Sequence, residues 1–293
     1  MSDTTASLTR KISSAGDLQS VVRTMKALAA SSIGQYEQSA RALGEYYRTV
    51  ELGLGACIRE SEPVALTMER KGQTNKGVLG AVVFGSDQGL VGQFNDRVAD
   101  FAVKTLAELP GKSQIWSVGE RVHARLSDTG LPLVGLFTVP NSVKTITPLV
   151  GQILVEHETH QERSEVTELH LFYNRPSSGA VYTTIHQRLL PLDEAWQQEL
   201  AERPWPTKNL PEVMGTGTDT LRALIREYLF VSLFRACAES LASENASRLA
   251  AMQRADKNID ELLETLHRTF HRLRQSSIDE ELFDVISGFE ALS

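Results

Sequence analysis

Apolar residues recur at steps of three and four along residues 8–54 of the chain and again along residues 259–289. This spacing averages close to the 3.5-residue period of a coiled-coil seam. All ten prolines lie between Pro63 and Pro211, so neither end of the chain contains the residue that breaks a helix interior. The sequence therefore predicts two long helices, residues 1–62 and residues 212–293.

The expected seam of each helix follows from this spacing. In the first helix it is Leu8, Ile12, Ala15, Leu18, Val22, Met25, Ala29, Ile33, Tyr36, Ala40, Leu43, Tyr47, Val50 and Leu54, and in the second it includes Ile259, Leu262, Leu263, Leu266, Phe270 and Leu273. At a rise of 1.5 Å per residue the helices would be roughly 80 Å and roughly 105 Å long. Asp219 is the expected N-cap of the second helix.

The end of the second helix carries an apolar tip, made of Ile278, Leu282, Ile286 and Phe289. If both helices start from the domain between them, they run antiparallel, and the second projects past the first by on the order of 25 Å. An exposed apolar tip requires a surface that holds it. A contact in a dimer or a frayed helix end are the alternative interpretations.

Residues 63–211 follow a different pattern, in which short apolar runs alternate with helical periodicity. Val78–Phe84 is a continuous apolar run of the kind that a buried parallel strand shows. Further strands are expected at residues 114–118, 133–139, 166–173 and 180–188, and helices at residues 98–109, 120–127 and 145–157. This order predicts a Rossmann-like α/β domain with a mostly parallel sheet and an antiparallel edge hairpin. The fold class is then α/β, with an antiparallel coiled coil of long N- and C-terminal helices bracketing that domain.

Composition narrows the class of function. The net charge of −7 argues against a nucleic-acid partner, which would require a basic face. The chain has no apolar run that approaches the ~18 residues of a membrane span. Its polar start, Met1–Lys11, lacks the apolar core of a signal peptide. We therefore expect a cytoplasmic protein without nucleic acid and without direct membrane insertion.

The glycine-rich turn at residues 85–92 raises the possibility of phosphate binding. Backbone N–H groups at the start of a helix can bind phosphate. However, Gln93 and Phe94 stand where a phosphate loop needs Lys and Ser or Thr. A structural turn is the favoured interpretation, and we expect no cofactor.

Histidine and cysteine spacings do not predict a metal or a catalytic centre. His157 and His160 are one residue short of zinc-protease spacing. His267 and His271 could grip a metal as an i, i+4 pair, but a solvated helix face is the favoured interpretation. Two cysteines, at positions 57 and 237, cannot form a disulfide framework and are expected to be small buried residues. We expect no catalytic residue and no metal.

Several ordered motifs resemble one family, the gamma subunits of rotary F-type ATP synthases. They are Arg10-Lys-Ile-Ser-Ser14, Thr24-Met-Lys-Ala-Leu-Ala-Ala-Ser31, Ser86-Asp-Gln-Gly-Leu-Val-Gly92, Glu239-Ser-Leu-Ala-Ser-Glu-Asn-Ala-Ser-Arg-Leu-Ala-Ala-Met252, Ala255-Asp-Lys-Asn258, Arg274-Gln-Ser-Ser-Ile278 and Ile286-Ser-Gly288. Each motif alone is weak, but the ordered set extends over nearly the whole chain. It resembles a divergent bacterial member, of the standard or an alternate operon type.

The resemblance implies a rotor shaft that is not itself catalytic. In such enzymes the coiled coil turns inside a hexamer of alpha and beta subunits, and the beta subunits carry the ATP sites. The α/β domain meets the epsilon subunit and the membrane c-ring. The implied location is the cytoplasmic face of the bacterial inner membrane, as a peripheral protein.

The resemblance also assigns site residues. Met25, Arg248 and Gln275 match positions that contact a beta subunit, and a guanidinium suits a carboxylate partner there. Asp87, Gly89 and Gly92 belong to the domain loop near epsilon and the c-ring, and the apolar tip would turn in the hexamer sleeve. Asp279 departs from the family pattern, because a hydroxyl residue is common beside that beta loop.

Two other classes of function remain open at this point. A coiled-coil adaptor that displays its α/β head would form a stable self-dimer and would not need ATPase subunits. A nucleotide-dependent enzyme would bind nucleotide through the turn at residues 85–92.

Overall fold

The computed structural model describes residues 4–60, 77–162, 166–178, 181–209, 211–213 and 217–290. The chain forms two compact units: unit 1 is Met1–Ala30 with Arg248–Ser293, and unit 2 is Ser31–Ser247. The two long helices, α1 (Thr5–Glu60) and α7 (Gly217–Glu290), each pass through both units. The domain boundaries expected from the sequence, after residues 62 and 211, lie instead near the ends of the two long helices. These boundaries stay a prediction.

Buried residues of α1 recur every seven positions. Leu8, Ala15, Val22, Ala29 and Tyr36 form this series, with Val50 two repeats after Tyr36, and each has at most 7% of its surface exposed. Leu43, at the position between them, is partly buried. The second core series of a heptad lies three or four residues after the first, according to whether the first occupies position a or position d. After Ala15 the buried residue is Gln19, four positions on, which is 9% exposed, whereas Leu18 is 55% exposed. The expected place of Leu18 in the seam was therefore wrong, because the series of Ala15 occupies position d and Gln19 the next position a.

The seam of α7 in unit 1 is confirmed in part. Met252 and Ile259 are buried with Val22 of α1, and Met25 and Leu263 pack against them. Leu262 is 50% exposed, contrary to expectation, because it lies one position away from the buried side of the helix. Hydrogen bonds from Gln19 to Asp260 and from Lys26 to Asp256 show that the two helices run antiparallel within this unit.

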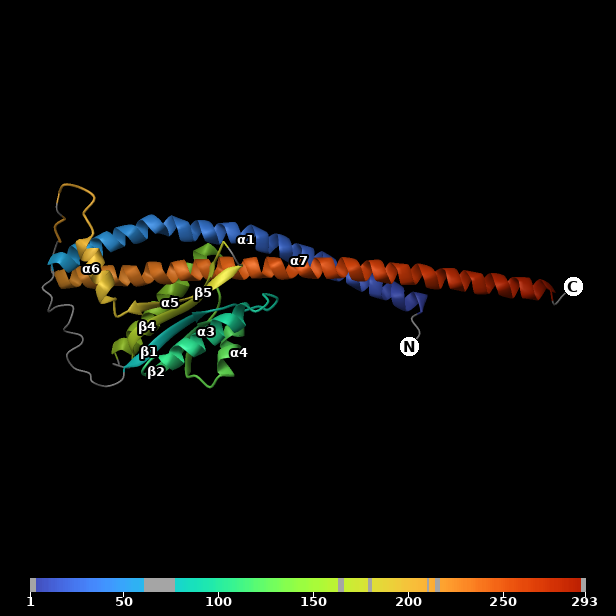
Figure 1. Cartoon of the computed structure of the whole chain (residues 1–293), viewed down its shortest axis with the longest axis horizontal. Helices are drawn as coiled ribbons and strands as arrows, with labels where there is room; N and C mark the ends of the chain where they lie inside the picture. Colours follow the sequence, from blue (N-terminus) through green and yellow to red (C-terminus); the bar gives the residue numbers. More distant parts are fainter. Residues whose placement is uncertain are drawn as a thin grey trace. The chain divides into compact units, whose positions relative to one another are not determined.

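Unit 2 is built on one five-stranded sheet (Figure 1). The strands are β1 (Val78–Phe84), β2 (Lys112–Val118), β3 (Leu133–Phe137), β4 (Val166–Pro176) and β5 (Tyr182–Leu190), in the order β3-β2-β1-β4-β5. The first four are parallel, and β5 pairs antiparallel with β4. The predicted sheet and its edge hairpin are confirmed.

The sheet separates two apolar layers. On one face, α3 (Phe94–Glu108) and α4 (Glu120–Ser127) pack on Ala81, Val83 and Ile115. On the other face, α5 (Ile146–Glu162) and the unit 2 parts of α1 and α7 pack on a larger core. Both Cys57 and Cys237 are buried in that second layer, as expected.

Three details differ from the sequence expectation. Strand β4 continues through Asn174 to Pro176, where a turn was expected, because the Asn174 side chain is buried and bonded to Phe94 O and Thr184 Oγ1. Helix α6 (Glu194–Glu202) was not predicted. Asp219 is not the N-cap of α7, since the helix already begins at Gly217 and Asp219 lies in its first turn.

The remaining element, η1 (Val143–Thr145), is a short 3-10 turn before α5, held by a capping box between Ser142 and Thr145. None of the helices in the described residues is both long enough and apolar enough to span a membrane.

Candidate functional site

Polar side chains of α1 converge on two carboxylates of α7 in unit 1. Lys26 Nζ lies 2.7 Å from Asp256 Oδ2, and Arg23 Nε lies 3.1 Å from Asp256 Oδ1. The pKa of the Asp256 carboxyl is lowered, and the hydrogen bond from Lys26 is the largest cause. Arg23 lowers this pKa as well. The Asp256 side chain is 13% exposed, whereas Arg23 is 57% exposed, so the carboxylate is largely covered and its cations lie at the edge of the apolar seam.

The three residues expected to contact a beta subunit do not gather at one place. Met25 is partly buried in the unit 1 seam. Arg248 is partly buried, and Gln275 is exposed further along α7. The separation of these two along one helix corresponds to roughly 40 Å. They would therefore meet a partner at separate levels of the helix.

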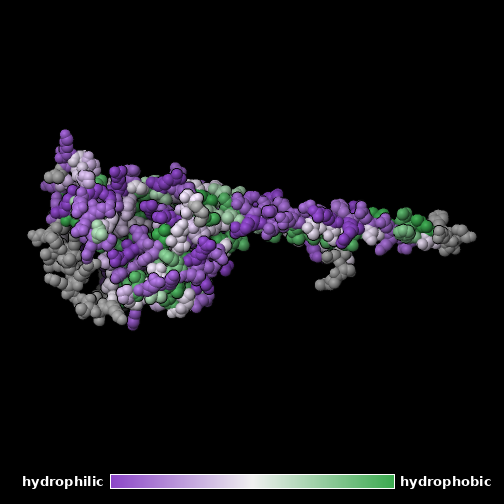
Figure 2. Space-filling view, in the orientation of Figure 1, coloured by the Kyte–Doolittle hydropathy of each residue, from purple (hydrophilic) through white to green (hydrophobic). Residues whose placement is uncertain are grey.

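The end of α7 is an exposed apolar surface (Figure 2). The exposed fractions there are 54% for Ile278, 57% for Leu282, 67% for Phe283 and 46% for Ile286. Phe289 is helical, but its side chain lies outside the described residues.

This surface extends beyond α1. Gln19 is level with Asp260, so the first described residue of α1 is level with about residue 275 of α7. The rest of α7 then projects by roughly 20 Å, close to the expected length.

Hydrogen bonds within unit 2 hold the glycine-rich turn in place. Asp87 Oδ1 accepts from the backbone N of Glu120 at 3.0 Å, and its Oδ2 accepts from the backbone N of Val139 at 2.9 Å. Asn95 accepts from the Ser86 backbone N at 2.9 Å and donates to the Ser86 hydroxyl at 2.8 Å. Of the turn's own backbone donors, the N–H groups of Gly85 and Ser86 are used inside the protein, and the Asp87 side chain ties the turn to neighbouring loops. These contacts favour a structural turn over a phosphate site.

The tip of the same turn presents an apolar side chain outward. Leu90 has φ of 63° and is 62% exposed, and Gly92 has φ of 59°. A positive φ is uncommon outside glycine and persists where the surrounding structure determines it. Close to Leu90, the Ser86 hydroxyl donates to Gln88 O within the turn. A Cβ added to Gly89 would meet no atom within 4 Å, and the φ of Gly89 is not positive. Neither a steric clash nor the backbone conformation therefore requires glycine at this position.

A histidine pair that the sequence analysis missed lies between β4 and β5. His170 Nδ1 is 2.9 Å from His186 Nε2, and His170 Nε2 is 3.0 Å from Glu168 Oε2. Burial lowers the pKa of both histidines. The register of the two strands was the signal that could have found it, because it sets Phe172 opposite His186 and thereby places His170 close by.

The other histidines form no centre. His157 is buried on α5, and burial lowers its pKa to about 4. The rings of His267 and His271 lie 6.5 Å apart on exposed positions of α7. Among the described residues, no group of three or more potential ligands is placed to hold a metal ion.

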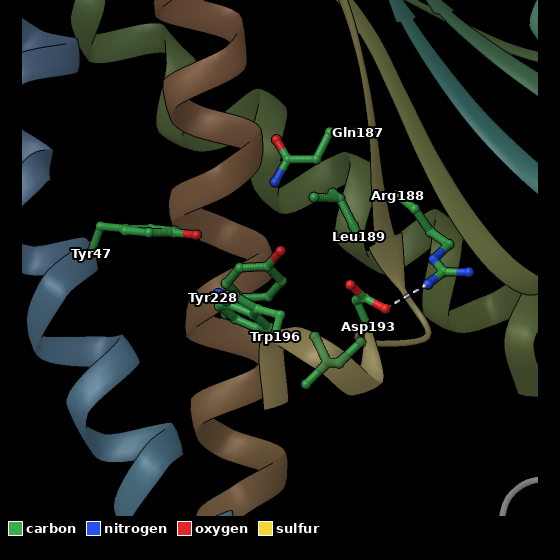
Figure 3. Close-up of a pocket in the computed structure, with 8 residues that line it drawn as sticks. Tyr47, Gln187, Arg188, Leu189, Asp193, Trp196 and Tyr228 are labelled. Atoms are coloured by element: carbon green, nitrogen blue, oxygen red, sulfur yellow. Dashed lines mark hydrogen bonds and ion pairs between the residues drawn. The ribbon is translucent and has the colours of Figure 1, made fainter. Parts of the chain in front are cut away.

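A cavity of about 170 Å³ in unit 2 lies where α6 meets α1, α7 and β5 (Figure 3). Its walls include Tyr47, Trp196 and Tyr228, with the Trp196 and Tyr228 rings 5.0 Å apart. Arg188 and Asp193 form an ion pair of 3.5 Å at its exposed side. Arg188 and Asp193 pair with each other and the rings pack together, which indicates that the cavity belongs to the junction that attaches α6 to the long helices.

Comparison with known proteins covers nearly the whole chain. A family model described as ATP synthase matches residues 4–292. The ATP synthase gamma chain of Clavibacter sepedonicus is 30% identical over 97% of this chain and 96% of its own length. That of Sorangium cellulosum (strain So ce56) is 27% identical over 98% of each chain.

Solved structures agree on the fold. A chain of the Euglena gracilis mitochondrial ATP synthase rotor has a TM-score of 0.64 and 18% identity, covering 94% of this chain and 98% of that chain. A chain of the same organism's OSCP/F1/c-ring structure has a TM-score of 0.65 and 16% identity, covering 98% and 94%. From the family model and the gamma-chain relatives together, the chain belongs to the family of ATP synthase gamma chains.

Proposed function

We propose that this chain is the central rotor shaft of an F-type ATP synthase. It couples ion flow through the membrane c-ring to conformational cycling of the ATP sites of the beta subunits, and it contributes no catalytic residue of its own. The observation that carries this proposal is α7, one unbroken helix of 74 residues that pairs with α1 in antiparallel fashion. Ordinary helices average about 11–12 residues, and a helix of this length is typical of a mechanical or scaffolding purpose.

The partners follow from that role. The shaft turns inside the hexamer of alpha and beta subunits and joins the epsilon subunit and the c-ring. A rotor with different faces biases each beta subunit toward a different conformation, since a partner shifts an equilibrium only by differential contact. We place the chain at the cytoplasmic face of the bacterial inner membrane, as a peripheral protein.

The proposed contacts with beta subunits are Met25, Arg248 and Gln275. Arg248 and Gln275 offer polar groups at two levels of α7, and Met25 offers a flexible thioether at the edge of the seam. Their separation suits a partner that touches the shaft at several heights.

The proposed role of Ile278, Leu282, Ile286 and Phe289 is to turn within an apolar sleeve of the hexamer. The first three are about half exposed in the chain alone, which supports a partner surface there. Asp87, Gly89 and Gly92 are proposed to shape the loop near epsilon and the c-ring. Since the Asp87 carboxylate is occupied by two backbone N–H groups, its contribution is to hold the loop.

Co-expression with the alpha and beta subunits of the same organism tests the proposal. The expected result is a complex with one copy of this chain per hexamer, whose ATP hydrolysis falls when the chain is omitted. A well-folded isolated chain that forms a self-dimer and no complex would contradict the rotor proposal and support the adaptor.

A further inference from the structure

Three side chains of α1 in unit 1 bind one carboxylate of α7. Asp256 accepts hydrogen bonds from Lys26 at 2.7 Å, from Arg23 at 3.1 Å and from Gln19 at 3.4 Å. Asp260, one turn further along α7, accepts a second hydrogen bond from Gln19 and lies 3.6 Å from the Arg23 guanidinium. We call these five residues the Asp256 cluster.

Two members of the Asp256 cluster occupy core positions of the heptad repeat. Ile12, Gln19, Lys26 and Ile33 follow one another at steps of seven, so polar residues replace the apolar residue at two successive repeats. Gln19 is 9% exposed and Lys26 is partly buried. Polar residues at core positions cost stability in a coiled coil, and their best-attested effect is to fix register.

The apolar seam around the cluster fixes the register less sharply than the polar contacts do. Burial of Val22, Met252 and Ile259 is favourable roughly in proportion to area and has no preferred direction, whereas a hydrogen bond needs a defined partner. A slip of one helical turn would move the donors by about 5.4 Å. With the side chains as they stand, that shift takes Lys26 Nζ and Arg23 Nε out of hydrogen-bond range of Asp256. The Asp256 side chain is 13% exposed, and a largely enclosed carboxylate with fewer donors is unfavourable.

We propose that Asp256 is a positioning residue that holds α1 and α7 of unit 1 in a single register, so that the two helices turn as one body under torque. The register itself is a property of the chain. Its consequence for torque rests on the proposed rotor function.

A distance measurement on the isolated full chain tests the register. Spin labels at Ser13→Cys and Arg272→Cys would report the α1–α7 distance, since both positions are exposed and the native thiols are buried. We expect one narrow distance distribution in the parent chain. In Asp256→Lys we expect the distribution to broaden at least twofold or to gain a second maximum displaced by about 5 Å, one turn.

Two further variants make this measurement specific. Lys26→Glu combined with Asp256→Lys reverses the ion pair and should restore the narrow distribution, because Arg23 can still pair with Asp260. The matched control is Glu261→Lys, which changes the same charge on α7 but breaks only the pair with Lys257 inside that helix. If Asp256→Lys does not fold, Asp256→Ala replaces it; it removes both acceptor oxygens, and broadening is again expected. A distribution as narrow as that of the parent chain in a folded Asp256 variant would overturn the proposal.

The assembled complex tests the consequence for torque. In membrane vesicles, the ion transport driven per ATP hydrolysed should fall at least twofold in Asp256→Lys and recover in the reversed pair, whereas Glu261→Lys should leave it unchanged. If Asp256→Lys transports as many ions per ATP hydrolysed as the parent chain, the proposed role of Asp256 in transmitting torque would be overturned. If the parent chain forms no complex, the rotor function fails, and the distance measurement still decides the register part.

Discussion

The imidazole of His170 lies between a carboxylate and a second imidazole: its Nε2 is 3.0 Å from Glu168 Oε2 and its Nδ1 is 2.9 Å from His186 Nε2. A carboxylate only accepts, so His170 donates through Nε2. His170 is 2% exposed, and burial lowers its pKa, which favours the neutral ring. In the neutral ring Nδ1 accepts from the N–H of His186, so the arrangement favours two neutral histidines in defined tautomers.

Replacing His170 by Leu should lower the free energy of unfolding by about 1–3 kcal/mol, because it leaves the His186 donor without its buried partner. Urea denaturation near neutral pH would measure the loss. His271→Leu is the matched control, since that side chain is exposed on α7. A His170→Leu variant as stable as the control would show that the pair contributes nothing.

Acid should destabilise the protein through His157. Burial, with a smaller effect of His160, lowers the pKa of His157 from 6.5 to about 4. The unfolded chain therefore binds more protons between these values, so the stability that His157 contributes is complete above pH 6.5 and is lost as the pH falls. The maximal slope is about 1.4 kcal/mol per pH unit.

The difference between parent and His157→Leu isolates this contribution. Other histidines also titrate in this range, so the measured quantity is the gap between the two pH profiles of unfolding free energy. The profile of His157→Leu should be flatter. Parallel profiles across the acid range would exclude His157 as the source.

The Asp87 carboxylate should be needed for the stability of unit 2. It accepts from the backbone N–H groups of both Glu120 and Val139. Asp87→Ala leaves both donors unpaired and should cost about 1–3 kcal/mol, whereas Asp87→Asn keeps one acceptor oxygen and should cost less. Denaturation of both variants would check the order. Equal stability of Asp87→Ala and the parent chain would show that water replaces the carboxylate.

Local patterns were enough to predict most elements of the fold. The strand Val78–Phe84 and the helix Glu120–Ser127 have the predicted bounds, because a continuous apolar run and a short amphipathic run are local signals. Helix α6 was missed since it has nine residues, and only Leu200 is buried in it. What holds it is contact with distant segments, such as the Trp196 and Tyr228 rings.

The candidate site was less predictable because it also depends on contacts between segments that are distant in the sequence. The exposed tip followed from residue spacing, but the Asp256 cluster depends on which α1 residues meet α7. That register decides that Gln19 rather than Leu18 faces the seam. The contacts proposed for Met25, Arg248 and Gln275 depend on surfaces of other subunits, about which the spacing of this chain carries no information.

Substitutions in the apolar tip should affect the activity or assembly of the complex and not the stability of the isolated chain. Leu282 and Ile286 are 57% and 46% exposed, so Leu282→Ser with Ile286→Ser should change the unfolding free energy little. If the tip turns in an apolar sleeve, the hydrolysis rate or the assembly of the complex should fall severalfold. Glu281→Ser, an exposed polar neighbour, should have no effect. Full activity of the double variant would exclude a role for these two side chains.

Two glycines of α1 in unit 2 should respond to alanine with opposite signs. A Cβ on Gly55 would lie 2.5 Å from the backbone O of Leu200 in α6, whereas a Cβ on Gly44 would meet nothing within 4 Å. Gly44→Ala should therefore stabilise the helix by about 0.5–1 kcal/mol. Gly55→Ala should destabilise unit 2 by about 1–3 kcal/mol, because α6 must shift. Thermal or urea denaturation would compare them. Stabilisation by both substitutions would show that α6 gives way without cost and is not firmly attached to α1.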